Sequence, residues 1–383
     1  MIFFHISDLH IGLKLFGRDL REDQEYIFDQ IVAQVEKEQP DAILIAGDIY
    51  DKALPSAEAV ETFDHFVSRL SEAAGSAEIM MISGNHDSAP RVNVFRSILS
   101  RQHIHMIGKP PTLPGERIEK VRLEDEYGAV HFYLLPFVKP SMVRAVIGPD
   151  ENGNTFSYDE TLRRLIGRET IDPAERNVLL SHQFYLPKGT KAEDVERMDS
   201  EIRTIGNIDE VSSEALAPFD YAALGHIHKP MRVGEDRFRY PGTPYACSVS
   251  EAGQQKGILK VCLGKKGELD VSVIPLHPKR QVRLIRGSLK EVLDQACEDY
   301  VSVVLTDRVD LDISDMNDRL RAAFPYLLEI RRETVRQVDY TRRLTLDQEM
   351  NPFELCCSFL QDIDDSEKEL LSDVVNTALA QAQ

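Results

Sequence analysis

Residues that could bind metal ions follow three apolar segments near the start of the chain. These motifs are Asp8-Leu9-His10, Gly47-Asp48-Ile49-Tyr50-Asp51 and Gly84-Asn85-His86-Asp87. Short apolar segments are typical of buried strands, and in open α/β sheets ligands bind beyond the carboxyl ends of strands. Carboxylates, amide oxygens and imidazoles are ligands of divalent cations. Any one motif alone also fits a polar turn, but three at equivalent strand ends favour a metal site.

The spacing inside the motifs indicates individual roles. Asp8 and His10 are two residues apart, so in an extended segment their side chains point to the same side. Gly47 allows close backbone approach, and Asp48 is placed to bridge two cations. Asp51 is expected to orient ligands and not to bind metal.

Two later apolar segments also end in histidine. His182 follows the segment Asn177 to Leu180, and Gly225-His226-Ile227-His228 follows Tyr221 to Leu224. A single histidine after a strand is usually structural, so only its place at another strand end supports His182. His226 and His228 form a second pair on one side of the chain. Both motifs are candidates for the same site.

The elements that position these motifs alternate between strand and helix. Helices are predicted over 19–39, from Pro55 to about Glu72 and near 91–100, which indicates a βαβ arrangement. Further strands are expected at 103–107, 117–123, 130–135, 257–263 and 269–276, with a helix ending near Arg168. The segment 188–207 reads as a long loop that faces substrate or partner.

Composition limits the class of protein. With 383 residues, 42% apolar and 28% charged, the chain has room for two or three globular domains. No apolar run approaches ~20 residues and the start enters a strand directly, so we expect no membrane span, no signal peptide and a cytoplasmic location. The five cysteines show no zinc spacing. A net charge of -19 argues against binding nucleic acid unaided, but it is compatible with bound cations or a basic partner.

The last third of the chain differs in pattern. Residues 280–335 alternate strand (280–287), helix (288–298), strand (300–306), helix (316–324) and strand (327–335). The most basic stretch of the chain comprises Arg331, Arg332, Arg336, Arg342 and Arg343, and a solvated strand face explains it about as well as the DNA-steering role that the resemblance described below implies.

From Asp347 onward the chain has nine acidic residues and one lysine. Two short amphipathic helices are predicted there, the first with Phe353, Cys356 and Leu360 on its apolar face and the second with Leu370, Leu371, Val374, Val375 and Ala378. An intramolecular flap is one interpretation of these helices, and docking in a partner groove is the favoured one. We therefore expect domains at 1–277, 278–345 and 346–383.

The five motifs, in this order, resemble those of the calcineurin-like metallophosphoesterases. Ile6 to Gly12, Ala46 to Asp51, Gly84 to Arg91 and Ala223 to Pro230 are similar to the SbcD-type nuclease subunits of bacteria. The resemblance implies an α/β fold, a four-layer α/β/β/α sandwich with a small α/β capping domain and C-terminal helices that dock a partner.

The resemblance also implies a site with two divalent cations. One ion would be held by Asp8, His10, Asp48 and His228, and the other by Asp48, Asn85, His182 and His226. His86 would protonate the leaving oxygen or stabilise the transition state, and Asp87 would orient His86. Two cations roughly 3.5–4 Å apart can activate water and neutralise a displacement at phosphorus. This cysteine-free set suits Mn²⁺, with Mg²⁺ less favoured and Zn²⁺ or Fe²⁺ possible.

The function implied is that of a metal-dependent DNA nuclease subunit. It would act as a double-strand 3'-5' exonuclease and a single-strand or hairpin endonuclease in DNA repair, recombination and replication. It would work with an SbcC-type, SMC-like ATPase, as a homodimer within a heterotetramer. Two alternatives stay open: a small-molecule phosphodiesterase or phosphatase, which would not need a capping domain, and a non-catalytic scaffold, which would tolerate a broken ligand set.

Overall fold

The computed structural model describes residues 1–190, 198, 201, 209–307 and 313–333, together with single residues between 357 and 375. The chain divides into two compact units, and the first comprises Met1–Leu305 and Leu311–Arg331. Among the described residues, no helix combines the length and the apolar character that crossing a membrane requires.

The first sheet has six strands in the order β16-β15-β1-β4-β5-β6. Four of them run parallel to one another, and β15 and β16 extend the sheet antiparallel beside β1. The bounds are β1 (Ile2–Ile6), β4 (Ala42–Ile45), β5 (Glu78–Ile82), β6 (Ile104–Ile107), β15 (Gly257–Leu263) and β16 (Leu269–Pro275). The parallel strands bring their carboxyl ends to one edge, as the βαβ pattern predicts.

The second sheet also has six strands, in the order β13-β14-β12-β9-β8-β7. The four strands from β14 to β8 are parallel, and the two edge strands are antiparallel to their neighbours. The bounds are β7 (Glu119–Asp125), β8 (Gly128–Leu135), β9 (Arg176–His182), β12 (Tyr221–Gly225), β13 (Met231–Val233) and β14 (Glu235–Tyr240). Two short pairs complete the fold, β2 (Lys14–Leu15) with β3 (Arg18–Asp19) and β10 (Phe184–Leu186) with β11 (Glu210–Ser212).

Alternating apolar side chains stack the two sheets into a sandwich. In β4, Leu44 faces the core between the sheets, whereas Ile43 and Ile45 face the helices. In β8, Phe132 points inward between the sheets and Tyr133 outward. Side chains alternate across a strand, so a strand that is apolar throughout supplies both cores.

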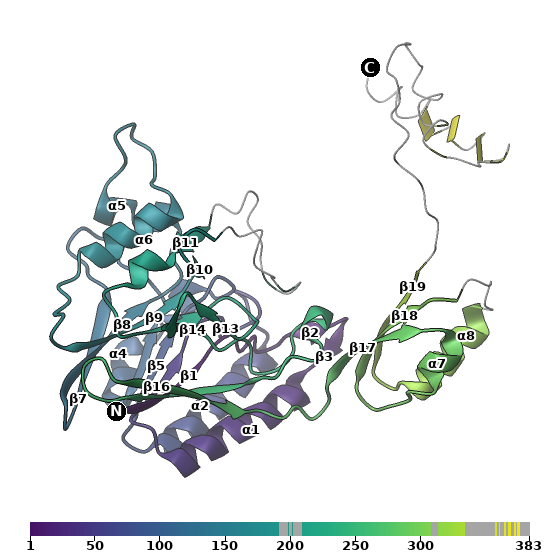
Figure 1. The fold of residues 1–383 in the computed structure, drawn as a ribbon, viewed down its shortest axis with the longest axis horizontal. Coiled ribbons are helices and arrows are strands. Elements are labelled where there is room, and N and C mark those ends of the chain that lie inside the picture. The colour runs from purple at the N-terminus through teal and green to yellow at the C-terminus, as the bar shows by residue number, and fades with distance from the viewer. Residues whose placement is uncertain are drawn as a thin grey trace. The chain divides into compact units, whose positions relative to one another are not determined.

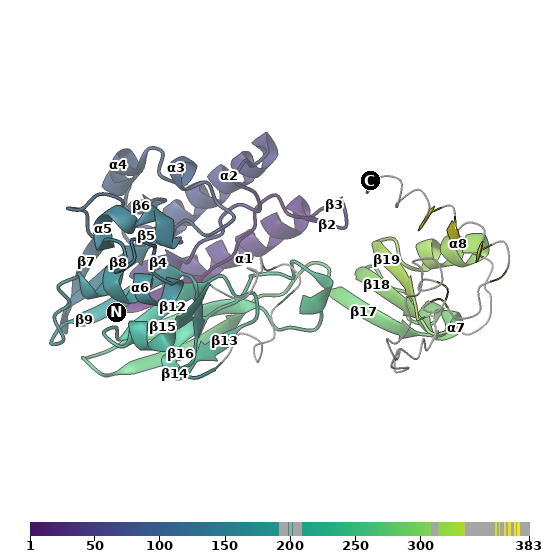
Figure 2. The same ribbon diagram turned by 90° about the horizontal axis from the view of Figure 1, so that it is seen from above.

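Helices cover the outer face of each sheet, which makes four layers (Figures 1 and 2). α1 (Arg21–Glu38) and α2 (Ala57–Ala74) pack on the first sheet, and α5 (Arg144–Ile147) and α6 (Tyr158–Gly167) on the second. Ser56 caps α2 by accepting a hydrogen bond from the backbone N–H of Ala59. This arrangement confirms the predicted α/β/β/α sandwich.

The helix expected near 91–100 is instead two short helices. α3 spans Ala89–Val92 and α4 spans Arg96–Leu99. Phe95, between them, adopts a left-handed conformation with φ of 60°. A left-handed residue ends a helix, so the prediction of one continuous helix was wrong.

A three-stranded sheet follows the sandwich. Its strands are β17 (Val282–Gly287), β18 (Tyr300–Leu305) and β19 (Leu327–Arg332), and its helices are α7 (Leu289–Leu293) and α8 (Ile313–Ala323). The predicted strand and helix order is confirmed, but α7 is shorter than the expected 288–298. Tyr300 pairs with Val282 at the start of two parallel strands, so the chain after α7 must return along the whole length of β17.

The docking helices expected from residue 346 onward fall mostly outside the described residues. Within the second of them, the described residues are helical at Glu367, Lys368, Leu371, Ser372, Val374 and Val375. The basic residues Arg336, Arg342 and Arg343 also lie outside the described part of the chain.

Candidate metal centre

The predicted ligands meet at the carboxyl ends of strands from both sheets. They follow or end β1, β4, β5, β9 and β12: Asp8, His10, Asp48, Asn85, His182, His226 and His228. The turns after β1 and β4 are joined by backbone hydrogen bonds, from Asp8 N to Gly47 O (2.9 Å) and from His10 N to Asp48 O (3.0 Å). The sandwich therefore brings together residues more than two hundred positions apart in the chain.

The first group consists of Asp8, His10 and His228, and all three side chains are buried. The Nε2 atoms of His10 and His228 lie 3.1 Å apart, and Nε2 of His228 lies 4.0 Å from Oδ1 of Asp8. Two ring nitrogens at this distance need a shared proton or cation between them, because two lone pairs repel. This geometry suits a cation.

The second group is arranged around Asn85 and Asp48. Oδ1 of Asn85 lies 3.0 Å from Nε2 of His182 and 2.8 Å from Nδ1 of His226. Oδ2 of Asp48 lies 3.3 Å from Nε2 of His182 and 3.9 Å from Nε2 of His10. Asp48 thus touches both groups, as expected for a bridging carboxylate.

In His10 and His182, the Nε2 atom faces the other candidate ligands and the Nδ1 atom faces an oxygen acceptor. Nδ1 of His182 lies 2.7 Å from the carbonyl oxygen of Ala46, which can only accept, so Nδ1 carries the proton. Nδ1 of His10 lies 3.6 Å from Oδ1 of Asp51. With Nδ1 carrying a proton, Nε2 is the ring nitrogen that can release its proton and bind a cation. At 3.6 Å, Asp51 can form an ion pair but no hydrogen bond with His10, so its orienting role stays a prediction.

His86 lies beside the two groups. Its backbone N–H donates to Oδ1 of Asp48 (2.8 Å), and its ring stands edge-on to His10 with centroids 4.8 Å apart. Nδ1 of His86 lies 2.9 Å from the carbonyl oxygen of Asp51 and therefore donates to it. Nε2 is the ring nitrogen left to act on a substrate.

Asp87 has different partners from those expected. Its carboxylate accepts from the backbone N–H groups of Ile49 (3.0 Å), Tyr50 (2.9 Å) and Gly84 (2.9 Å). The prediction that Asp87 orients His86 was wrong, because the ring of His86 is held by the Asp51 carbonyl. Asp87 instead ties the turn after β5 to the turn after β4.

The backbone at the site is strained in four places. Asp8, His10 and Asp48 have φ of 54°, 43° and 48°, and His226 has φ of 104°. Side chains other than glycine rarely adopt these values, and such residues cluster at functional sites where the surrounding structure enforces them. The sequence gives no signal for this strain.

Burial and the neighbouring carboxylates together determine the pKa values of the titratable groups at the site. Burial opposes a charge on His10, but the carboxylates of Asp51 and Asp48 outweigh burial and raise the pKa of His10 to about 8. Burial likewise opposes a charge on His182, and Asp48 raises the pKa of His182 to about 9. Burial and the charge of Asp48 raise the pKa of Asp87 to about 6, against its three backbone donors.

A cavity of about 510 Å³ opens over the first group. His10, Asp51 and His228 line it on one side, and Phe16 of the β2–β3 turn and Arg331 of β19 line it elsewhere. Phe16 is 53% exposed. A substrate in this cavity would therefore meet two candidate ligands, an aromatic ring and a guanidinium group.

Sequence reasoning missed residues that hold His228. Oε1 of Glu201 accepts from the backbone N–H of His228 (2.9 Å), and Oε1 of Glu251 lies 3.4 Å from Nδ1 of the same residue. Glu201 lies within the predicted 188–207 loop, so that segment reaches the site at this residue. Neither glutamate has a strand-end motif that could have identified it.

Replacing Gly84 with alanine should weaken metal binding. A Cβ at Gly84 would lie 2.1 Å from Oδ1 of Asp48, so the bridging carboxylate must move. Since Asp48 faces both groups, we expect Gly84→Ala to lower the affinity for both ions by at least about tenfold in calorimetric titration with Mn²⁺. Gly167→Ala, where a Cβ meets nothing within 4 Å, is the control and should bind normally. Unchanged binding in Gly84→Ala would contradict the bridging position of Asp48.

Metal affinity should rise with pH. A metal ion binds neutral imidazole, and the raised pKa values of about 8 for His10 and about 9 for His182 keep both rings protonated near neutrality. Affinity should therefore increase by up to about tenfold per pH unit for each proton displaced, until the pH passes these pKa values. Titrations in buffers of different ionisation enthalpy measure the released protons. An affinity that stays constant between about pH 6.5 and pH 9 would refute this expectation.

Comparisons with known proteins agree with this geometry. Residues 1–230 match the family model of the calcineurin-like phosphoesterases, and residues 278–363 match the SbcD C-terminal model, described as the type 5 capsule protein repressor C-terminal domain.

Two solved structures are similar in fold. A dimetal phosphatase from Danio rerio has 14% sequence identity and a TM-score of 0.43, covering 72% of this chain and 96% of its own. GAP50, the anchor in the inner membrane complex of Plasmodium, has 12% identity and a TM-score of 0.36, covering 73% of this chain and 90% of its own. At these values neither bears on the activity of this chain.

The phosphoesterase model covers more than half of the chain and includes all the residues that meet at the strand ends. The chain is therefore a metal-dependent phosphoester hydrolase in its fold and donor set, and it belongs to the calcineurin-like phosphoesterases as an SbcD-like member.

Proposed function

We propose that this protein is the nuclease subunit of a DNA-processing complex and hydrolyses phosphodiester bonds. The observation that carries the proposal is the buried Asp48 carboxylate, whose Oδ2 faces His10 of the first group and His182 of the second, next to the cavity of about 510 Å³. Shared carboxylates of this kind serve sites with two cations.

The ligand sets proposed for the two ions are those that the family resemblance implies, and the short contacts at the site support them. One ion would be held by Asp8, His10, Asp48 and His228, and the other by Asp48, Asn85, His182 and His226. When bound, two divalent ions activate a water molecule and neutralise the charge that develops at phosphorus. The imidazole-rich donor set favours Mn²⁺ over Mg²⁺. The carbonyl oxygen of Ala46 holds the imidazole of His182 in the orientation that this binding needs.

His86 is the proposed general acid. Donation from Nδ1 to the Asp51 carbonyl fixes the ring, and a protonated Nε2 can then deliver its proton to the leaving oxygen. The backbone of His86 is held by Asp48, so the acid keeps a constant position relative to the ligands. Asp87 is not part of the proton transfer and supports the turn.

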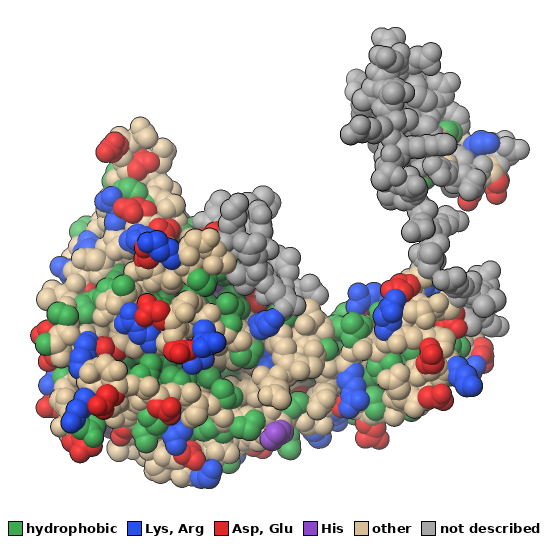
Figure 3. All heavy atoms as spheres, viewed as in Figure 1, with side chains coloured by type: hydrophobic (Ala, Val, Ile, Leu, Met, Phe, Trp, Pro, Cys, Tyr) green, Lys and Arg blue, Asp and Glu red, His purple; other side chains and the backbone are tan. Residues whose placement is uncertain are grey.

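DNA as the substrate is supported by the capping region. Arg331, from the basic stretch of the sequence, lines the cavity, although it also pairs with Glu329 (3.0 Å). Acidic and basic side chains are intermixed on the face of the described residues shown in Figure 3. With a net charge of -19, the chain needs a partner to hold DNA. An SbcC-type ATPase is the proposed partner.

The proposed assembly is a homodimer within a heterotetramer. The region of α3 and α4 exposes Val94 (49%), Phe95 (69%) and Ile98 (63%), and Val60 of α2 is 46% exposed. Exposed apolar side chains of this size support a contact with another chain. The 37 residues from 347 to 383 are the proposed site for docking the ATPase.

The proposed function predicts Mn²⁺-dependent cleavage of a DNA hairpin and a linear duplex, measured with and without an SbcC-type partner and ATP. His86→Gln should reduce cleavage by about 10²- to 10⁴-fold, because it removes the acid, while Mn²⁺ affinity stays near that of the parent. His65→Gln, an exposed position of α2, is the matched control and should cleave normally.

Two results would contradict these assignments. Cleavage of bis-p-nitrophenyl phosphate alone, under every condition, would replace the nuclease assignment with that of a small-molecule phosphodiesterase. Loss of Mn²⁺ binding in His86→Gln would show that His86 is a ligand and not the acid.

A further inference from the structure

One loop packs against the candidate ligand His228 on the side of its Nδ1 atom, whereas its Nε2 atom faces His10 and Asp8. This segment, residues 242–256, is called the 242–256 loop below. At its start, Gly242 has φ of 74°, and a Cβ there would lie 2.5 Å from the carbonyl oxygen of His228. The backbone N–H of Thr243 donates to the same oxygen (3.3 Å). The loop therefore packs directly on the backbone of His228.

Glu251 of this loop is fully buried and contacts the His228 ring. Its Oε1 lies 3.4 Å from Nδ1 of His228 and accepts from the hydroxyl of Ser248 (3.1 Å). Its Oε2 accepts from the hydroxyl of Thr243 (2.8 Å). Glu251 is 1% exposed and His228 is 1% exposed. A carboxylate in this position favours a proton on Nδ1 and directs Nε2 to the cation side.

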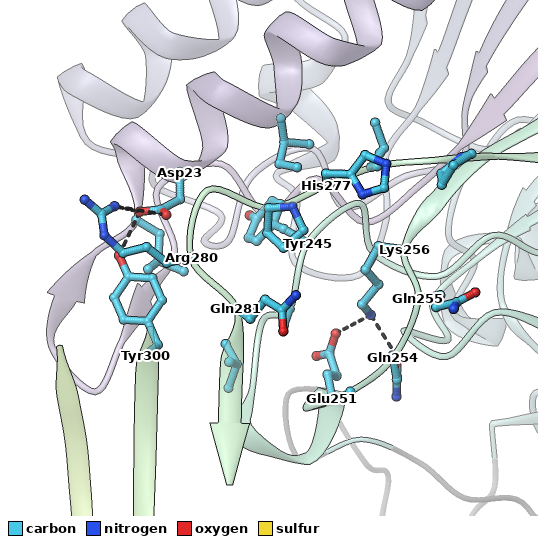
Figure 4. Close-up of a pocket in the computed structure, with 18 residues that line it drawn as sticks. Asp23, Tyr245, Glu251, Gln254, Gln255, Lys256, His277, Arg280, Gln281 and Tyr300 are labelled. Carbon is cyan, nitrogen blue, oxygen red and sulfur yellow. Dashed lines mark hydrogen bonds and ion pairs between the residues drawn. The ribbon is translucent and has the colours of Figure 1, made fainter. Parts of the chain in front are cut away.

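Lys256 compensates the buried charge of Glu251. Nζ of Lys256 lies 2.6 Å from Oε2 of Glu251, an ion pair seen in Figure 4. The same Nζ lies 3.1 Å from the carbonyl oxygen of His228 and 2.7 Å from the hydroxyl of Thr243. Lys256 therefore holds both the Glu251 carboxylate and the His228 backbone. Its side chain is 4% exposed, so solvent screens these contacts little.

Two other interpretations of this cluster are weaker. Cys247, Glu251 and His228 are near enough to bind a cation of their own, but the Lys256 ammonium beside Glu251 would repel it. A cavity of about 530 Å³ also lies next to Lys256. The charged side chains that line it pair with one another, Lys256 with Glu251 and Arg280 with Asp23 (Figure 4). The described lining therefore offers no unpaired charge for an ionic ligand.

We propose that Glu251, neutralised by Lys256, is a positioning residue that fixes the ring of His228 for metal binding. Removing an outer partner of a metal-binding histidine typically costs about 10- to 100-fold in metal affinity. The effect should be confined to one of the two ions, because Glu251 contacts the ring of His228, which is a proposed ligand of that ion alone. The inference rests on the proposed assignment of His228 as a ligand.

The test is calorimetric titration of the full-length, metal-free protein with Mn²⁺, followed by electron paramagnetic resonance of the bound Mn²⁺. Glu251→Gln should weaken one of two binding events by about 10- to 100-fold and leave the other unchanged. Glu251→Asp keeps a negative charge beside Lys256, so the fold should be preserved. Its side chain is shorter, however, and cannot reach both Lys256 and the ring of His228. It should weaken the same event.

Asp125→Asn is the matched control. Asp125 pairs with the buried Arg176 and with the N-terminal amine, at the opposite end of β1 from the site. This variant should lower the thermal unfolding temperature without changing either Mn²⁺ affinity. If the role of Glu251 were purely structural, both Glu251 variants would behave like Asp125→Asn: they would unfold at a lower temperature and bind both Mn²⁺ ions with unchanged affinity. That result would overturn the inference.

His228→Gln separates the inference from the assignment on which it rests. We expect this variant to abolish the event that the Glu251 variants weaken. If His228→Gln abolishes one event while both Glu251 variants bind normally, only the positioning role is wrong. If His228→Gln also binds normally, the ligand assignment and the positioning role are both wrong. DNA cleavage is not needed for either conclusion.

Discussion

The burial of Asp48 is the constraint on which the site depends. This carboxylate is 1% exposed and faces His182 and His10, the backbone N–H of His86 and the glycine at position 84. A buried carboxylate is costly unless cations or donors surround it. Both sheets must therefore bring their histidines to this point, and the position facing Asp48 must lack a side chain.

The buried charge of Asp48 also links metal binding to the stability of the turns at the strand ends. The raised pKa values of His10 and His182 show that protons compensate Asp48 when no cation does. Metal binding replaces these protons, and its free energy adds to the stability of the native state. The positive φ values of Asp8, His10 and Asp48 are sustained by the backbone hydrogen bonds between the turns.

Much of the sandwich could be predicted because its strands are continuous apolar runs that end in polar motifs. The alternation of Ile43, Leu44 and Ile45 between two cores has a simple physical cause in strand geometry. The division of the predicted helix 91–100 into two short helices depends on the left-handed backbone of Phe95. Hydrophobic periodicity gives no indication of such a residue.

Only the residues of the candidate site that belong to strand-end motifs could be predicted from the sequence. Polar residues at strand ends have a local signal, and the structure brings all of the predicted ligands together. The partners of Asp87 are backbone groups of another turn, which side-chain types cannot reveal. Glu251 and Lys256 act through contacts across the fold with His228, and their surrounding sequence has no pattern typical of a metal site.

The central claim is that two cations share one buried carboxylate. The most direct measurement is the Mn²⁺ stoichiometry of the purified chain, by calorimetry and by elemental analysis after removal of free metal. The account predicts two ions per chain in the parent, with spin coupling between them, and loss of that coupling in Asp48→Asn. One ion per chain, or two uncoupled ions that Asp48→Asn leaves in place, would contradict it.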